Sequence, residues 1–449
     1  MNRRHTWVAA GAVVAAASLV AGCAGTARPA ATDATGSQAG GSGGATTVTF
    51  RSWAPIDPAL GGMIDAFEAG HEGVTVDATT MGGPDYWVDL AARVTSSTMS
   101  DVVGLMPGAQ TQQYRDHLLP LNDCAVRVWG EDWEDKFHPI ALDQARLGNP
   151  EGDDNYYGLP VLSQIMNIWA NSEIMEQEGA TIPATWAELE AVTPTYEGKG
   201  FTPFLLGAKE YWLNTSIYLE LANNISPGTV YQAEDGEVPW TDPALVQAFE
   251  YWQKLFTDGI AQPGANALAP YPDAVGMFEA GDALFLPLGS QWIQQSDPTA
   301  DQDTIAPLSR GMEGYEPFLF PTIPGGADEP QFVGGAEFLF GIAKSSTNQE
   351  QACDLITDWI AGDGGQVLIN TLFDLPAVKG MEPEAFTSDK QRDIYRLMAD
   401  EWLPEVKYSR YFKEPKIETA VADALAAVAA GSMTPAEAAE SVQKVYDTL

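Results

Sequence analysis

Basic residues are scarce in this chain of 449 residues, where 23 Lys and Arg stand against 62 Asp and Glu and the formal net charge is −39. A strongly acidic surface repels nucleic acids and anionic lipid headgroups, so neither is expected as a partner. It also argues against an anionic ligand, unless basic residues are concentrated at the site. The alternative is that the acidity serves solubility alone, and composition leaves both interpretations open.

Cysteine and histidine are also scarce. Besides Cys23, the chain has only Cys124 and Cys353, and it has no C-x-x-C pair. These two could form a disulfide outside the cytoplasm or remain buried thiols. The few histidines show neither i, i+4 spacing nor an H-E-x-x-H motif, so we expect no metal or other cofactor.

Motifs for nucleotide binding and nucleophilic catalysis are missing. The sequence "EGKG" at 197–200 is not a phosphate-binding loop. A G-x-S-x-G pattern at 40–44 lacks the strand and helix that a nucleophile elbow needs. Paired carboxylates could hydrolyse glycosides, but among 62 acidic residues that signal has no specificity.

The N-terminus has the pattern of a secretory signal. Arg3 and Arg4 precede an apolar run at 7–21, which is too short for a confident membrane span. Small residues directly before Cys23 resemble a bacterial lipobox, in which Cys23 would be diacylated and become the new N-terminus. An ordinary signal peptide with a chance cysteine is the alternative.

We therefore expect a signal peptide at 1–22 and a lipid-anchored flexible tether at 23–45, which is rich in Gly, Ala, Ser and Thr. The mature chain keeps 21 basic and 62 acidic residues, a charge of −41. The predicted location is the outer face of the bacterial cell membrane, and the anchor makes the membrane a partner.

The rest of the chain begins with a strand, helix, strand, helix, strand rhythm. The strands are "TTVTFRSW", "GVTVDATTM" and "SDVVGLM", and the helices are "DPALGGMIDAFEAGH" and "GPDYWVDLAARVTSS". This order predicts a parallel sheet with helices on its faces. Ligands of such sheets lie beyond the carboxyl ends of the strands, here Ser52–Asp57, Met81–Asp85 and Leu105–Gln110.

Later helices show clear start signals, and short strands between them indicate a second α/β region. Capping boxes are predicted at Thr185, Thr347 and Thr434. Asp242 before Pro243 opens another helix, which has one apolar stripe.

An ordered series of segments along the mature chain is similar to the solute-binding lipoproteins of bacterial ATP-binding-cassette (ABC) sugar importers, the group of maltose-binding protein. The segments include "VTFRSW", "DVVGL", "LLPLND", "YYGLPVLSQIMNIWANSEIMEQEGATIPATWAEL", "MFEAGDALFLPLGSQW" and "FVGGAEFLFGIAKSSTNQEQACDLITDWI". The resemblance implies an α/β fold with two lobes, of the type II periplasmic-binding-protein kind, joined by a hinge that the chain crosses several times. The ligand cleft would lie between the lobes.

The resemblance also implies where the chain crosses the hinge: near 158–161, 331–334 and 375–381. The N-terminal lobe would comprise 46–158 and 333–378, and the C-terminal lobe 159–332 and 379–449. Cys124 and Cys353 would then share the N-terminal lobe, which favours a disulfide without deciding the matter.

A sugar site needs flat aromatic faces for stacking and polar groups in fixed positions. The expected ligand-binding residues supply both kinds of group, some from the ends of predicted strands and some from segments of the resemblance. They are Trp53, Asp57, Gln110, Gln164, Glu210, Tyr211, Trp212, Gln291, Trp292, Gly335, Glu337, Trp402 and Tyr408.

Three of these expectations carry specific reasons, and one residue outside the list, Arg410, is weighed with them. Gln164 interrupts an apolar run and could bond a hydroxyl or a neighbouring backbone group. Trp292 is the expected stacking platform, although an extra residue after Gly289 makes Gln291 an alternative contact. Gly335 would let a ligand approach the backbone. Arg410 would favour an acidic sugar if it faced the cleft, but we expect an ordinary surface charge.

The predicted function is capture of a mono- or oligosaccharide and its delivery to a permease that works with partner ATPases, by a monomer without enzymatic activity. One alternative keeps the fold but binds a polyamine or another non-sugar solute, and would show several acids converging in the cleft. A secreted carbohydrate-active enzyme is the other alternative.

Overall fold

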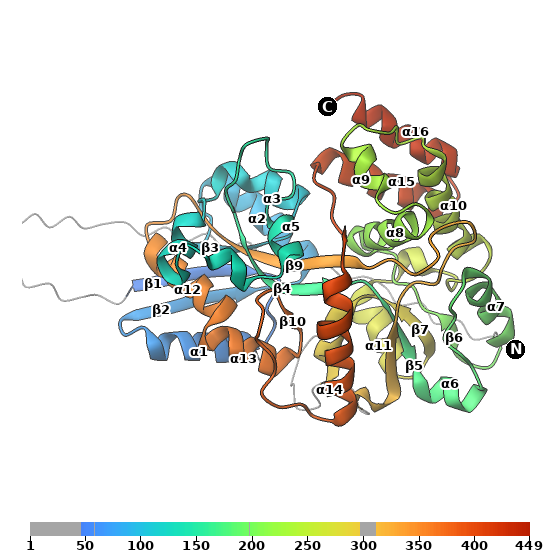
Figure 1. The fold of residues 1–449 in the computed structure, drawn as a ribbon, viewed down its shortest axis with the longest axis horizontal. Helices are drawn as coiled ribbons and strands as arrows, with labels where there is room; N and C mark the ends of the chain where they lie inside the picture. Colours follow the sequence, from blue (N-terminus) through green and yellow to red (C-terminus); the bar gives the residue numbers. More distant parts are fainter. Residues whose placement is uncertain (1–45, 58, 197, 297–310) are drawn as a thin grey trace, which may run out of the picture. The chain divides into compact units, whose positions relative to one another are not determined.

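The computed structural model describes residues 46–57, 59–196, 198–296 and 311–449. The expected signal peptide, the tether and lipidated Cys23 lie outside the described residues. Figure 1 shows the fold along the chain. Its strands are β1 (Thr46–Ser52), β2 (Val74–Thr80), β3 (Val102–Leu105), β4 (Leu159–Ile165), β5 (Ile168–Asn171), β6 (Thr202–Phe204), β7 (Ala283–Pro287), β8 (Tyr315–Phe318), β9 (Val333–Ile342), β10 (Leu375–Pro376) and β11 (Tyr408–Ser409).

The helices alternate with these strands. In the first part of the chain they are α1 (Ala59–Gly70), α2 (Gly83–Ser96), α3 (Ala109–Tyr114), α4 (Asn122–Trp129) and α5 (Pro139–Ala145). The middle part contains α6 (Ser172–Glu178), α7 (Trp186–Tyr196), α8 (Tyr211–Ile225), α9 (Thr229–Glu234), α10 (Pro243–Thr257) and α11 (Val275–Glu279). The last part contains α12 (Gln349–Ala361), α13 (Asp363–Leu372), α14 (Asp389–Arg396), α15 (Pro415–Ala429) and α16 (Pro435–Tyr446).

Two sheets carry the α/β architecture. The larger has the order β10-β4-β9-β3-β1-β2, with β11 paired to β9, and the smaller has the order β6-β7-β5-β8. β1 pairs in parallel with both β2 and β3, while β9 runs antiparallel to β3 and β4. The predicted parallel strand and helix rhythm at the start of the chain is confirmed.

Each sheet belongs to its own hydrophobic core, as expected of the two-lobed fold. The first core gathers residues such as Phe50 and Trp359, and the second gathers residues such as Trp169 and Phe249. On β4 the core changes between Leu162 and Ile165. The strands β4 and β9 therefore run from one core into the other, and the lobe limits named above remain a prediction.

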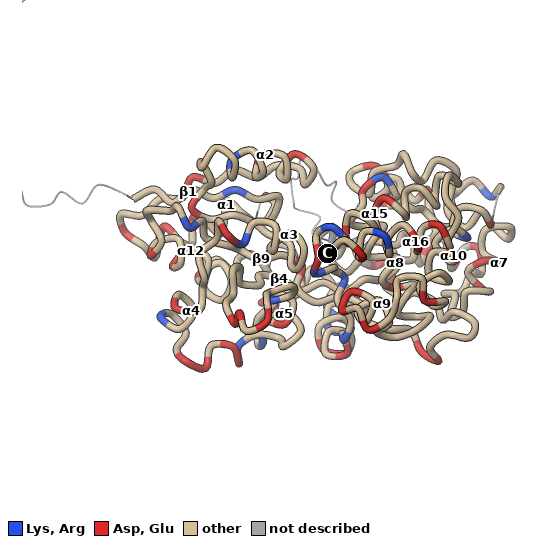
Figure 2. The backbone as a smooth tube through the Cα atoms, turned by 90° about the horizontal axis from the view of Figure 1, so that it is seen from above, with Lys and Arg blue, Asp and Glu red and all other residues tan. Residues whose placement is uncertain are grey.

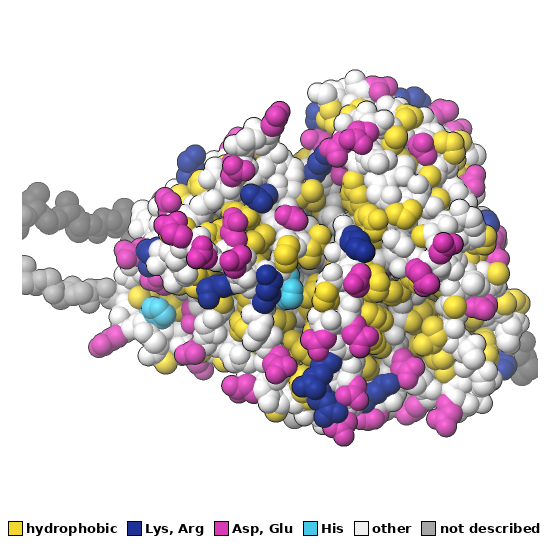
Figure 3. Space-filling model, in the orientation of Figure 1, with side chains coloured by type: hydrophobic (Ala, Val, Ile, Leu, Met, Phe, Trp, Pro, Cys, Tyr) yellow, Lys and Arg dark blue, Asp and Glu magenta, His cyan; other side chains and the backbone are white. Residues whose placement is uncertain are grey.

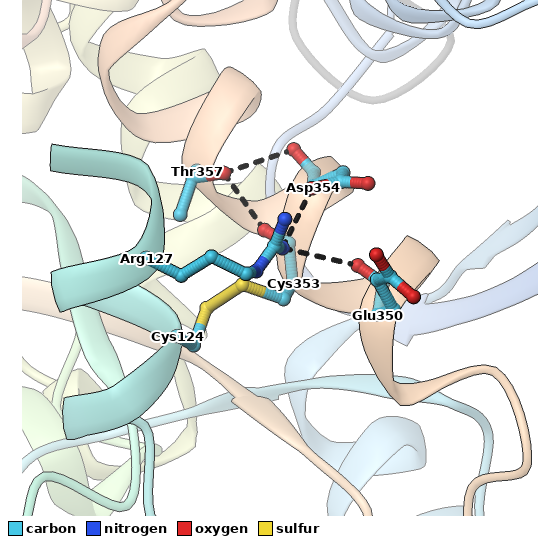
Figure 4. The surroundings of a disulfide bond; sticks show 6 residues. All are labelled: Cys124, Arg127, Glu350, Cys353, Asp354 and Thr357. Atoms are coloured by element: carbon cyan, nitrogen blue, oxygen red, sulfur yellow. Dashed lines mark hydrogen bonds and ion pairs between the residues drawn. A yellow bond between two sulfur atoms is a disulfide. The ribbon is translucent and has the colours of Figure 1, made fainter.

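A disulfide joins Cys124 of α4 to Cys353 of α12, with an S–S distance of 2.05 Å (Figure 4). Beside it, Arg127 Nη2 contacts Asp354 Oδ1 at 2.6 Å. The two cysteines are 229 residues apart in sequence and both belong to the first core. The structure thus decides between the two alternatives in favour of the disulfide.

Most predicted helix starts are found, and one is wrong. Thr434 and Glu437 form a complete capping box, and Asp242 accepts a bond from the backbone of Ala244. Thr185 and Glu188 also bond reciprocally. The box at Thr347 does not form, because α12 begins one residue later, with Asn348 at the N-cap and no side-chain bond.

Acidic side chains greatly outnumber basic ones. Acidic residues lie along the described chain from end to end, whereas basic residues are few (Figure 2). The face drawn in Figure 3 has the same character, with acidic side chains over most of its extent. No helix within the described ranges is long and apolar enough to cross a membrane.

Candidate functional site

Polar side chains gather where the hinge strands β4 and β9 pass between the two cores. We call this set the interlobe polar cluster. Its members come from both cores and from the hinge strands: Gln110, Gln164, Tyr211, Tyr271, Gln291, Glu337, Asp374, Arg410, Tyr411 and Glu418.

Strand pairing brings three of these residues close together. Gln164 of β4 pairs with Gly335 of β9. Glu337 lies where the register of β4 and β9 shifts, between the pairs Leu162–Phe338 and Ser163–Ala336, so it is the extra residue of a bulge. Ser163 pairs with both Ala336 and Leu375, so Asp374 lies across from Gln164, and its hydrogen bond to the Glu337 carboxyl keeps the two acids together. The amide and the two carboxyls thus belong to three neighbouring strand segments.

Direct contacts join the two lobes beside this region. On the first lobe, the Gln110 side chain donates to the Tyr211 hydroxyl at 3.1 Å. The backbone N–H of Ala109 donates to the carbonyl of Phe412 at 2.8 Å. Gly108, at φ +69°, allows this approach, since a Cβ there would lie 2.2 Å from the Phe412 oxygen. Tyr211 is therefore the aromatic of the "EYW" segment that faces the first lobe.

Gln164 is 1% exposed and donates to the Gln291 side chain. Gly289, at φ +140°, leaves room for the two amides, because a Cβ there would lie 2.4 Å from one and 2.6 Å from the other. Tyr271 also bonds Gln291. The bonding partner of the Gln164 amide is thus another side chain rather than a backbone group.

The hinge carries a buried charge cluster. Asp374, 0% exposed, hydrogen-bonds the carboxyl of Glu337. Arg410 Nη2 donates to the Glu337 carbonyl at 3.3 Å and also bonds the Tyr411 hydroxyl, and its guanidinium lies 4.5 Å from the Tyr411 ring centroid. Burial and the neighbouring Asp374 raise the pKa of the Glu337 carboxyl well above its usual value, and Arg410 opposes that shift.

A further carboxyl lies at the Gln110 and Tyr211 side of the cluster. Burial raises the pKa of Glu418 to about 7, although a hydrogen bond from Gln110 opposes the shift. The pKa of Tyr211 is raised, first by burial and then by the nearby Glu418 carboxylate. The Tyr411 hydroxyl interacts electrostatically with both Glu337 and Glu418, so it lies between the two acidic positions.

The structure corrects two of the expectations. Arg410 is 5% exposed and is not an ordinary surface charge, because it is enclosed with Glu337 and Tyr411. The space over Gly335 is not open to a ligand, since the Gln144 side chain fills it and bonds the backbone of Gly334 and Ala336 at 2.6 Å and 2.9 Å.

The two strand-end tryptophans differ in exposure. Trp292 is fully buried among Trp169, Phe278 and Tyr315, so it presents no open face in this conformation. Trp53 is half-buried, and its ring centroid lies 4.8 Å from that of Trp87. A stacking role remains a prediction for both.

The remaining expected residues lie away from the cluster's centre. Asp57 is exposed, and Glu210 accepts a bond from the indole of Trp212 at 2.8 Å. Trp402 packs against Phe332, and Tyr408 lies parallel to Tyr231 with centroids 6.1 Å apart. Their contact with a ligand stays a prediction.

Sequence reasoning did not select Asp374, Tyr271 or Glu418 as site residues. Asp374 is a single acid within "LFDLPAV", the same kind of polar interruption that singled out Gln164. Glu418 lies on an ordinary amphipathic helix, and no local pattern distinguishes it from the other acids there. Among the described residues, no group of three or more potential ligand side chains could hold a metal ion.

Known proteins resemble this chain in sequence and in fold. A profile of the family described as bacterial extracellular solute-binding protein matches residues 62–393. This chain belongs to the bacterial extracellular solute-binding proteins. The solute-binding protein is 23% identical to an uncharacterized ABC transporter extracellular-binding protein of Pyrococcus horikoshii, over 51% of this chain and 52% of that relative. The match thus spans about half the length of the relative.

Solved structures share the fold of this solute-binding protein. A chitin oligosaccharide binding protein matches with a TM-score of 0.73 and 22% identity, over 90% of this chain and 98% of the other. A maltose-bound protein of T. maritima matches with a TM-score of 0.72 and 17% identity, over 90% and 100% of the two chains. At such identities the likeness establishes the two-lobed fold. The family and these neighbours are binding proteins, not enzymes.

Proposed function

We propose that this protein captures a sugar between its lobes and delivers it to the permease of an ABC importer. The observation that carries the proposal is the interlobe polar cluster, which places amides, carboxyls, a guanidinium and tyrosines from both lobes in one region. Sugar hydroxyls both donate and accept hydrogen bonds, so such a mixed set of groups suits them. Two proteins of the same fold agree with this proposal, since one is a chitin oligosaccharide binding protein and the other is bound to maltose.

Capture would use the hinge. Gln110 of the first lobe and Tyr211 of the second already contact each other, and a sugar inserted there would bond both lobes at once. A ligand stabilises the closed arrangement only through contacts that the open one lacks. The residues that face each other across the lobes therefore determine how strongly binding drives closure.

The lipid anchor belongs to this proposal. Acylation of Cys23 would hold the binding protein at the outer face of the membrane, beside the permease that receives the sugar. Two or three acyl chains suffice for stable anchoring. If Cys23 is acylated, the full chain should be found in the membrane fraction of cells, and the Cys23→Ser variant should be released from it.

Glycoside hydrolysis fits the carboxyl pair poorly. Glu337 and Asp374 hydrogen-bond each other, whereas the two carboxyls of glycosidases stand at least about 5 Å apart on either side of the bond to be cleaved. The polyamine alternative gains some support from the converging acids. Arg410, enclosed in the same cluster, would oppose a purely cationic ligand.

The test is thermal unfolding of the purified protein against mono- and oligosaccharides, polyamines and amino acids, with a parallel assay for products. A saturating sugar at 100 times its Kd should stabilise the fold by about 2.7 kcal/mol. Gln110→Ala should weaken sugar binding about tenfold, whereas Gln113→Ala, an exposed glutamine on the same helix, should not. Stabilisation by polyamines alone, or formation of a product, would contradict the proposal.

A further inference from the structure

The interlobe polar cluster contains more carboxyl groups than basic groups. Glu337, Asp374 and Glu418 contribute carboxyls, and Arg410 contributes a single guanidinium. Three phenols, of Tyr271, Tyr395 and Tyr411, also face the Glu337 and Asp374 pair. Phenols remain neutral near pH 7, so they do not balance the excess of acid.

Two enclosed atoms of the cluster have no hydrogen-bond partner among the described residues. One is Oε2 of Glu337, an acceptor when the carboxyl is ionised. The other is Nε of Arg410, a donor on a side chain that is 5% exposed. A buried polar atom without a partner destabilises the protein, because it has lost its hydrogen bonds to water without replacing them. The pair therefore calls for a ligand that supplies a donor to Glu337 and an acceptor to Arg410.

We propose that the sugar carries a protonated amine, which Glu337 and Asp374 receive, while Arg410 donates to a neighbouring hydroxyl oxygen of the same ligand. This inference rests on the proposed function and specifies its substrate class. An amino sugar satisfies both free atoms and also supplies the missing positive charge. A uronic acid would bring a further negative charge next to three carboxyls and is disfavoured.

The pair also predicts a proton movement on binding. Two adjacent buried carboxyls cannot both ionise easily, so one of them holds a proton in the ligand-free protein. An ammonium group placed against the pair permits both to ionise. Binding of an amino sugar should therefore release roughly one proton to solvent, whereas binding of a neutral sugar should release none.

The experiment compares matched ligands by titration calorimetry at pH 7. The pairs are glucose with glucosamine, galactose with galactosamine and mannose with mannosamine, together with the N-acetylated forms and the uronates. At least one amine should bind about tenfold or more tightly than its neutral partner, and N-acetylation should remove the gain. Titrations in phosphate and in Tris should differ in apparent enthalpy for the amine alone, because the buffer takes up the released proton.

Two variants locate the effect. Glu337→Gln should abolish the preference for the amine over its neutral partner, whereas Glu401→Gln, which removes one exposed acid, should leave the preference unchanged. Equal affinities for amine and neutral partner, or a preference that survives in Glu337→Gln, would overturn the inference and leave sugar capture intact. Should Glu337→Gln fail to fold, an amine-bound complex of the unchanged protein that releases no proton overturns it equally. A panel in which no sugar binds overturns the proposed function itself, and the inference with it.

Discussion

Enclosed polar side chains have different surroundings in the first and second cores. In the first, Asp101 accepts bonds from the backbone and side chain of Thr49, both at 2.8 Å, and from Ser346 at 2.6 Å. Burial alone would raise the pKa of Asp101, but the bonds from Ser346 and Thr49 outweigh it and lower the pKa. Tyr86 likewise donates to the Gly104 carbonyl at 2.7 Å.

In the second core, the side chains of Glu220 and Tyr218 have no such partners among the described residues. Every residue of α8 from Leu213 to Ile225 is buried, so a polar side chain on any face of that helix is enclosed. Within the described ranges, the enclosed side-chain atoms without a partner all lie in the second core or on the hinge segments, and none lies in the first core. Among the described residues, the enclosed polar side-chain atoms of the first lobe are thus hydrogen-bonded, while the hinge and the second lobe hold enclosed atoms without a partner.

The largest expected effect on stability comes from the disulfide of the first core. Replacing Cys124 and Cys353 together by serine should lower the free energy of unfolding by about 3–5 kcal/mol, because the disulfide closes a long loop in the unfolded chain. Chemical denaturation measures the loss. Sugar affinity should be unchanged, since α4 and α12 contribute no residue to the interlobe polar cluster. A loss of affinity without a loss of stability would contradict this assignment.

A smaller effect of opposite sign is expected in the second core. Burial raises the pKa of Glu220 well above its usual value, so the stability it contributes is present at acidic pH and is lost as the pH rises through the pKa of the folded state. Glu220→Gln should therefore be more stable than the unchanged protein by about 1–3 kcal/mol at pH 8. Chemical denaturation from pH 5 to pH 8 should show that the difference in free energy of unfolding between Glu220→Gln and the unchanged protein grows as the pH rises.

The control for this prediction is Glu250→Gln, an exposed acid on α10. It should alter stability by less than about 0.5 kcal/mol at any pH in the series. A Glu220→Gln protein that gains nothing at pH 8 would mean that Glu220 finds a partner in solution, and the contrast between the cores would weaken.

The smallest expected effect concerns the threonines at the two predicted capping boxes, Thr434 before α16 and Thr347 before α12. Thr434→Ala should cost about 1 kcal/mol, because it removes the side-chain cap of α16. Thr347→Ala should cost almost nothing, since Thr347 does not cap α12. Thermal unfolding of the two variants side by side is the measurement. Equal losses would show that the two threonines act alike despite their different geometry.

The first βαβαβ segment was predictable from sequence because apolar periodicity alone specifies it. The exposure of Trp53 and Trp292 was not predictable in this way. Both residues follow a strand, but Trp53 is half-buried and Trp292 is fully buried, because the side chains around them differ. Three rings of the second core close over Trp292, and their contacts are long-range.

The candidate site was partly predictable for the same reason. Gln164 was visible as a polar break in an apolar run, and Gln110, Gln291 and Glu337 followed from strand ends and the family resemblance. Asp374 and Glu418 lie far from the other cluster residues in sequence, and only the tertiary fold brings them to the hinge. Local sequence patterns do not reveal such long-range contacts.

The link between α4 and α12 has a further consequence for the backbone. Because the bonded cysteines lie 229 positions apart, all four strands of the smaller sheet are enclosed in a covalent ring. A protease that cut once anywhere inside this ring would leave both products attached. Such a nicked molecule would migrate as a single species until a reductant separated the fragments.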